Sequence, residues 1–147
     1  MLSDPVVLLA TLLSVGVVVA TLTIGVRVRP RPGLASGLLA ALPPTLALAL
    51  IASLAVHMHG SLGGWPETIG ERGFPELLSL HAGVAQWAFA GVLLSVLVLV
   101  PVAALVSGLV PAWRRWLGPV GVHGAACWLC LVAVQLAPEP FLNWWWD

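Results

Sequence analysis

The chain has 147 residues, of which 60% are hydrophobic and only 8% are charged. Soluble domains carry about 25% charged residues, so this composition excludes an ordinary soluble domain. It also excludes a disordered chain, which needs low hydrophobicity and high charge. Six basic side chains are balanced by six acidic ones, which leaves no basic face, and we expect no nucleic-acid partner. The remaining class is the integral membrane proteins.

Four apolar, charge-free stretches are long enough to cross a bilayer, which takes about 20 residues in a helix. Within lipid each backbone N–H and C=O must be satisfied inside its own segment, so we expect helices rather than an open sheet. The sequence therefore predicts an all-α integral membrane protein with a four-helix bundle. It forms a single membrane domain over 1–147, with helices at about 5–26, 34–56, 77–110 and 119–137 and an outer loop over 58–75.

Prolines interrupt two of these stretches. Pro43 and Pro44 lie inside the second and Pro101 lies inside the third, and each is expected to kink its helix. The third stretch is too long for one straight crossing, so it must tilt, kink at Pro101 or project from the membrane.

The distribution of charge predicts the orientation. Two short loops are basic and contain no acid, and these loops carry Arg27, Arg29, Arg31, Arg114 and Arg115. The acids all lie on the opposite side, at Asp4, Glu67, Glu71, Glu76, Glu139 and Asp147. Since short loops rich in Arg stay in the cytoplasm, we expect a multi-pass protein of the cell (inner) membrane with both termini on the outer side, N-out and C-out.

Tryptophans are expected at both membrane surfaces, where an amphipathic indole sits at headgroup level. Trp113 and Trp116 bracket the inner Arg pair, and Trp144–Trp146 lie at the outer side. Trp87 and Trp128 lie within helices and are predicted to be packing residues.

The outer ends of two consecutive helices carry histidines. His57 closes the second helix and His81 opens the third at the same face, so the two can meet at similar depth. Two facing imidazoles are what a b-type haem needs for axial ligation, and Arg72 in the connecting loop could pair with its propionates. A membrane histidine can equally ligate the magnesium of a (bacterio)chlorophyll. The alternative is that both side chains only form hydrogen bonds at headgroup level.

A second interpretation of this region involves a metal ion. If the second helix ends at His57, the sequence His57-Met58-His59 becomes extended, and its two imidazoles share a face. Together with His81 they would supply three nitrogen ligands, which suit copper or zinc.

The fourth helix carries His123, Cys127 and Cys130 on one stripe, at a spacing of i, i+4 and i+7. Soft ligands on one face could bind a metal or act in redox chemistry. The CxxC spacing resembles that of membrane disulfide-forming enzymes, but those need a second cysteine pair and this chain has only two Cys. We therefore expect both cysteines to act as small hydrophobic side chains.

Small residues are patterned for close helix packing. They recur along the third helix at Ala82, Ala85, Ala88 and Gly91, and on the fourth helix at Gly121 and Ala125. A pump or channel usually has acidic or basic residues inside its helical bundle. None lies inside any of the four apolar stretches.

The histidines and the loops around them suggest a family. His57, a Gly-rich loop, "LLSLH" ending at His81, and "WRRWLGPVGVHG" together resemble small four-helix membrane proteins associated with haem–copper oxidase assembly. The resemblance covers roughly residues 50 to 135, and Pro43-Pro44 and the CxxC depart from it. It implies a role around a terminal oxidase, with His57 and His81 at the metal or haem position.

We therefore expect a small multi-pass subunit or assembly factor of a larger electron-transfer complex, respiratory or photosynthetic, with no independent catalytic activity. The expected cofactor is haem b, with copper or (bacterio)chlorophyll as alternatives. A cofactor-free structural subunit is the competing interpretation.

Overall fold

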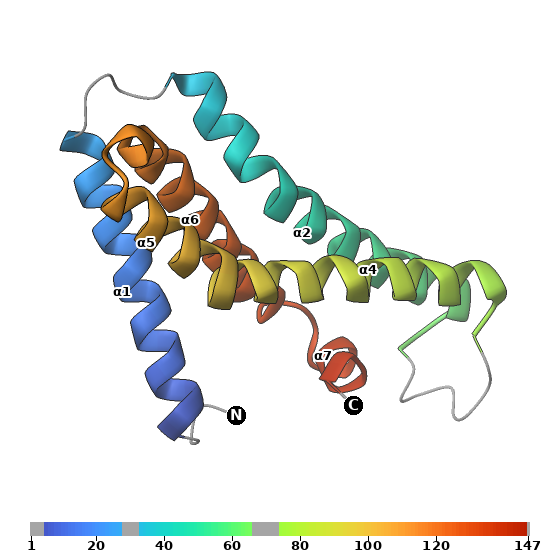
Figure 1. Ribbon diagram of the computed structural model, residues 1–147. Coiled ribbons are helices and arrows are strands. Elements are labelled where there is room, and N and C mark those ends of the chain that lie inside the picture. Colours follow the sequence, from blue (N-terminus) through green and yellow to red (C-terminus); the bar gives the residue numbers. More distant parts are fainter. Residues whose placement is uncertain (1–4, 28–32, 66–73, 147) are drawn as a thin grey trace.

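The computed structural model describes residues 5–27, 33–65 and 74–146, and every described regular element is helical. In chain order they are α1 (Pro5–Arg27), α2 (Leu34–Leu62), α4 (Glu76–Leu94), the π-helical turn η1 (Ser95–Leu99), α5 (Val100–Leu109), the 3₁₀ helix η2 (Pro111–Trp116), α6 (Leu117–Val134) and α7 (Glu139–Trp146). Figure 1 shows their arrangement.

Four helical spans are long and apolar enough to cross a membrane, as predicted: Leu8–Arg27, Leu34–Leu62, Glu76–Leu109 and Pro111–Val134. The second span continues to Leu62, into the region expected to be loop, and ends where Gly63 adopts a left-handed conformation with φ 68°. The fourth helix ends at Val134, before the predicted boundary at 137. Beyond it a short turn leads into α7, which the sequence reading did not anticipate.

The last long helix, α6, is the centre of the bundle. It packs against α1, α2 and α5, whereas α4 packs mainly along the second half of α2 (Figure 1). The described arginines, Arg27, Arg114 and Arg115, lie at the end where α1 finishes and η2 turns back. The described acids, Glu76 and Glu139, begin α4 and α7 toward the other end.

Glycines bring α1 and α6 close together. A Cβ atom built on Gly25 would lie 2.7 Å from the backbone of Gly118, and one on Gly124 would lie 2.6 Å from Val18. The Gly121 position expected to pack closely does so, against Leu22. Small residues therefore set the spacing of this helix pair, as membrane helices require.

The π-helical turn η1 is explained by Pro101. The N–H of Val100 donates to the carbonyl of Ser95, five residues back. In that register the next donor, to Val96, would be residue 101, but proline has no N–H. The hydroxyl of the buried Ser14 on α1 instead donates to the Val96 carbonyl at 2.8 Å. A carbonyl inside an apolar span that would otherwise lack a donor thus receives one from a neighbouring helix.

Aromatic side chains fold α7 back against the bundle. Phe141 is fully buried, and its ring stacks on Trp145 with centroids 5.8 Å apart. Trp145 also meets Phe89 of α4 edge to face at 5.5 Å. The tryptophans predicted at the membrane surfaces therefore differ in burial. Trp145 is part of the core, whereas Trp113 and Trp116 of η2 are about half exposed. The prediction that Trp87 is a packing residue was wrong, since 82% of it is exposed on the outside of α4.

Candidate functional site

The structure brings His57 of α2 and His81 of α4 into direct contact. Their Nδ1 atoms are 3.0 Å apart and their ring centroids are 5.3 Å apart. Both rings are half-buried in the seam between the two helices. The pairing follows from helix packing, because Leu54 and Met58 on α2 and Leu78 on α4 are fully buried in the same core cluster.

Ser53, which the sequence reading missed, completes the site. It precedes His57 by one helical turn, so it lies on the same face of α2. Its hydroxyl is 3.1 Å from Nε2 of His81 and donates to the carbonyl of Leu50 at 2.9 Å. The signal in the sequence was a polar residue at i−4 from a membrane histidine.

These contacts suit one arrangement of the protons. The single hydroxyl proton of Ser53 goes to Leu50, so Ser53 accepts from the Nε2–H of His81. Neutral His81 then has an unprotonated Nδ1, which accepts from the Nδ1–H of His57. Ser53 therefore selects the tautomer of His81 whose lone pair faces His57.

The third outer histidine, His59, lies apart from this pair. It contacts Trp65, with ring centroids 5.0 Å apart and an edge-to-face arrangement. Because α2 stays helical to Leu62, the extended His57-Met58-His59 geometry on which the three-imidazole interpretation depended does not occur. Among the described residues no group of three or more His, Cys, Asp or Glu could hold a metal ion. Arg72, expected to pair with haem propionates, lies outside the described residues.

A haem does not fit the pair as it stands. Metal–imidazole bonds are about 2 Å long, so two nitrogens on opposite sides of an iron are about 4 Å apart. The observed 3.0 Å separation is that of a hydrogen bond. A porphyrin would have to separate the rings and the two packed helices that carry them. Haem ligation by both histidines therefore stays a prediction that this geometry does not favour. Ligation of (bacterio)chlorophyll by a single histidine stays a prediction.

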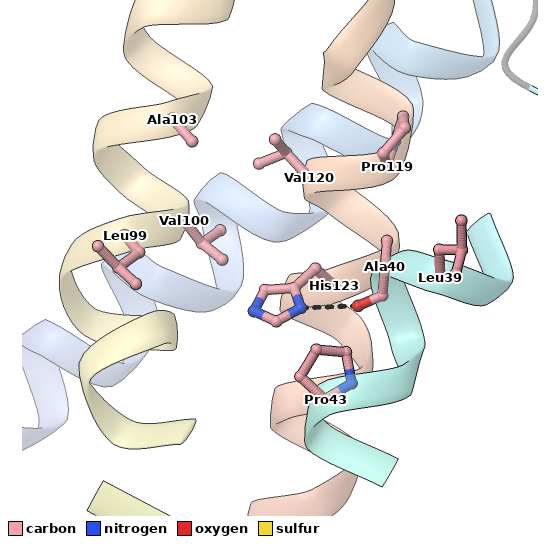
Figure 2. A pocket seen from close by; sticks show the side chains of 9 residues that line it. All are labelled: Leu39, Ala40, Pro43, Leu99, Val100, Ala103, Pro119, Val120 and His123. Atoms are coloured by element: carbon pink, nitrogen blue, oxygen red, sulfur yellow. Dashed lines mark hydrogen bonds between the residues drawn. The ribbon is translucent and has the colours of Figure 1, made fainter. Parts of the chain in front are cut away.

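The other predicted cluster is centred on His123 of α6. Its Nδ1 lies 2.7 Å from the carbonyl oxygen of Ala40 on α2 (Figure 2). Its Nε2 lies 3.6 Å from the sulfur of Cys127. Cys127 and Cys130 are both buried free thiols within α6. Along α2, Ala40 and His57 are about 25 Å apart, at the usual rise of about 1.5 Å per residue. The His123 cluster and the His57–His81 pair are therefore separate sites.

Proline explains why His123 meets a backbone carbonyl. In a regular helix the carbonyl of Ala40 would accept from residue 44, which is the buried Pro44 and has no N–H. His123 supplies the missing donor, and because a carbonyl only accepts, Nδ1 must carry the proton. The sequence predicted a kink at Pro44 and a polar stripe at His123, but not that His123 would donate to the carbonyl that Pro44 leaves without a donor.

Comparisons of the chain with protein-family models, with curated proteins and with solved structures yield no match.

Proposed function

We propose that the chain is a small multi-pass membrane subunit or assembly factor of an electron-transfer complex, and that it holds a copper ion at the His57–His81 pair. The carrying observation is the 3.0 Å separation of the two Nδ1 atoms on neighbouring helices. Two imidazoles on one metal ion, with bonds of about 2 Å, lie about 2.8 Å apart at neighbouring corners of the square that Cu²⁺ prefers and about 3.3 Å apart on a tetrahedral ion. A shift of a few tenths of an ångström therefore converts the hydrogen-bonded pair into two ligands.

The proton arrangement supports this proposal. Ser53 already orients the Nδ1 lone pair of His81 toward the site. Only His57 must change, by moving its proton from Nδ1 to Nε2, for both lone pairs to converge. Histidine ligands are commonly held in one tautomer by a hydrogen bond at the other nitrogen, as Ser53 does here.

Copper is favoured among divalent ions because imidazole sites bind Cu²⁺ more tightly than Zn²⁺. Two protein ligands leave coordination positions open for water or for a group of a partner protein. Such an incomplete site suits a subunit that completes or supplies a metal centre in a larger complex.

The orientation belongs to the same proposal. The basic ends of α1 and η2 lie in the cytoplasm, which puts both termini and the histidine pair at the outer side of the cell membrane. A single cysteine placed at the C-terminus, in a Cys127→Ala, Cys130→Ala background, should react with an impermeant thiol reagent in intact cells. Reaction only after lysis would contradict this topology.

The metal site is tested on the purified protein by copper titration and metal analysis. His57→Ala and His81→Ala should each abolish stoichiometric copper binding, whereas the matched controls His59→Ala and His123→Ala should retain it. Ser53→Ala should weaken binding by about tenfold, because loss of the hydrogen bond that orients a metal-bound histidine costs about 10- to 100-fold in affinity. Copper retained by both pair variants would overturn the assignment, and an absorption spectrum with haem or pigment bands would replace copper with a porphyrin.

A second candidate is a cofactor-free structural subunit. The observation that favours it is that the nitrogens between the rings and the Ser53 hydroxyl already satisfy one another without any ligand. On this interpretation the pair only joins α2 to α4. The native chain and His57→Ala should then bind the same amount of copper and of zinc.

A further inference from the structure

Two hollows lie beside His123 at the level of the proline pair of α2, and both have His123 and Pro43 in their walls. One has a volume of about 270 Å³ and lies between α2, α5 and α6, with Val100 and Ala103 opposite Pro43 (Figure 2). The other has a volume of about 260 Å³ and lies between α2, α4 and α6. They share these two lining residues, so they adjoin each other within the apolar spans, and the pair is called the two-lobed space below.

Small side chains and prolines keep this space open. Ala88 and Gly91 line the second lobe, and a Cβ built on Gly91 meets no atom within 4 Å. The predicted small-residue stripe of α4 therefore has two roles. Ala82 and Ala85 are buried in helix packing, whereas Ala88 and Gly91 face the hollow.

The polar groups of the space are few. They are Nε2 of His123, the thiol of Cys127 and the hydroxyl of Ser95, set among aliphatic walls. Because Nδ1–H of His123 is committed to Ala40, Nε2 of the neutral ring is an acceptor. In Figure 2 this nitrogen points away from Ala40, toward the side of the space that carries Leu99 and Val100. Its present partner, the Cys127 thiol at 3.6 Å, is a weak donor.

We propose that this two-lobed space binds the hydroquinone ring of a membrane-dissolved quinol, whose hydroxyl donates to Nε2 of His123. An acceptor within apolar walls selects an apolar molecule that carries an O–H donor. Each lobe exceeds the volume of about 150 Å³ in which an engineered protein cavity holds benzene, so one ring fits beside His123. The position within the membrane spans gives access from the lipid phase, where such molecules dissolve. This site is separate from the histidine pair and does not depend on copper binding there.

The proposal is tested with decylubiquinol and its dimethyl ether, titrated onto the full chain in nanodiscs. The two probes share ring, substituents and tail, but the ether has no O–H. We expect the quinol to bind about 3- to 10-fold more tightly than the ether, because one neutral hydrogen bond contributes about 0.5–1.5 kcal/mol. Equal affinity of the two probes would overturn the proposal and leave an apolar groove for acyl chains.

Variants locate the site. Ala103→Leu and Gly91→Leu fill one lobe each without touching the His123–Ala40 contact, and at least one should lower quinol affinity tenfold or more. The matched control is Ala90→Leu, on the exposed face of α4 beside Gly91, which should leave affinity unchanged. Unchanged binding in both filled variants would place the quinol elsewhere.

Variants of Cys127 distinguish a hydrogen bond to Nε2 from a purely structural role of His123. The measured quantity is the affinity for the quinol compared with that for its ether. Cys127→Ser puts a stronger donor beside Nε2 and should weaken quinol binding about 3- to 10-fold, whereas the ether should bind as before. Cys127→Ala removes the competing donor and should bind the quinol at least as tightly as the native chain. A serine variant that binds the quinol as tightly as the native chain would show that Nε2 does not contact it.

Discussion

The bundle joins its helices through histidine at two places, and the two contacts are of different kinds. Where α2 ends and α4 begins, His57 meets His81, so one imidazole donates and the other accepts, and the donated proton can move to the other nitrogen of His57. Near the other end His123 meets the Ala40 carbonyl, which accepts and does nothing else. The first contact can exchange its proton for a metal ion, whereas the second fixes one proton permanently. The partner, more than the histidine itself, decides whether the residue is chemically available.

The largest effect on the unfolding free energy should come from forcing α1 and α6 apart, which disturbs the His123 contact and leaves the His57–His81 contact in place. Gly25→Ala places a Cβ 2.7 Å from the backbone of Gly118, where no side chain can move aside. We expect a loss of about 2–3 kcal/mol in unfolding free energy, measured in detergent, because overpacking typically costs about 1–3 kcal/mol. The damage should reach α6 and His123 while copper binding at the outer pair, which joins α2 to α4, is kept. Gly16→Ala, with open space around its Cβ, is the control.

The next effect isolates the inner contact. His123→Ala leaves the Ala40 carbonyl without a donor and should cost about 1–2 kcal/mol. Pro44→Ala restores an N–H that can donate to that carbonyl within α2. In this background the cost of His123→Ala should fall by about 1 kcal/mol, and a double-mutant cycle measures the coupling. Fully additive effects would mean that the freed carbonyl is not what His123 satisfies.

The outer pair should matter less to stability than to binding. His57→Ala and His81→Ala should each cost about 0.5–1 kcal/mol, since one hydrogen bond in a half-exposed seam is lost. The double variant should cost little more than either single one, because both remove the same contact. A loss of more than about 2 kcal/mol of unfolding free energy in either variant would contradict this, and would mean that the pair stabilises the bundle as much as the His123–Ala40 contact does.

The smallest effect is expected at His59, two residues from His57. It is exposed and outside the pair, so His59→Ala should change the unfolding free energy by less than about 0.5 kcal/mol. The contrast with His57→Ala tests whether proximity in sequence or position on the helix face defines the site. Equal effects of the two variants on copper binding would return His59 to the ligand set.

Composition was enough to predict the helical class and the four spans, because a helix satisfies every backbone group within a single apolar stretch of about 20 residues. The meeting of His57 with His81 was predicted because they end and begin consecutive helices at the same face of the bundle. Its details were not, since Ser53 and the ring contact depend on how α2 and α4 rotate against each other. α7 was missed although Glu139-Pro140 is a typical helix start.

The contact of His123 with Ala40 was beyond sequence reasoning for a different reason. Pro44 leaves the carbonyl four residues before it without a donor in its own helix, but the sequence does not indicate which helix supplies another. That depends on the depth at which α6 lies beside α2, which is set by the glycines that pack it against α1. The same limit hid Ser14 and its bond to the Val96 carbonyl next to Pro101.

The central place of α6 has a consequence for biosynthesis. A ribosome makes α1 and α2 before α6, yet both find much of their packing surface on α6, the last of the four long spans. Until α6 enters the bilayer, the Ala40 carbonyl has no His123 and the glycine face of α1 has no partner. The early spans must therefore wait in the lipid, exposed to membrane proteases or to a chaperone, until translation of the final span completes the bundle.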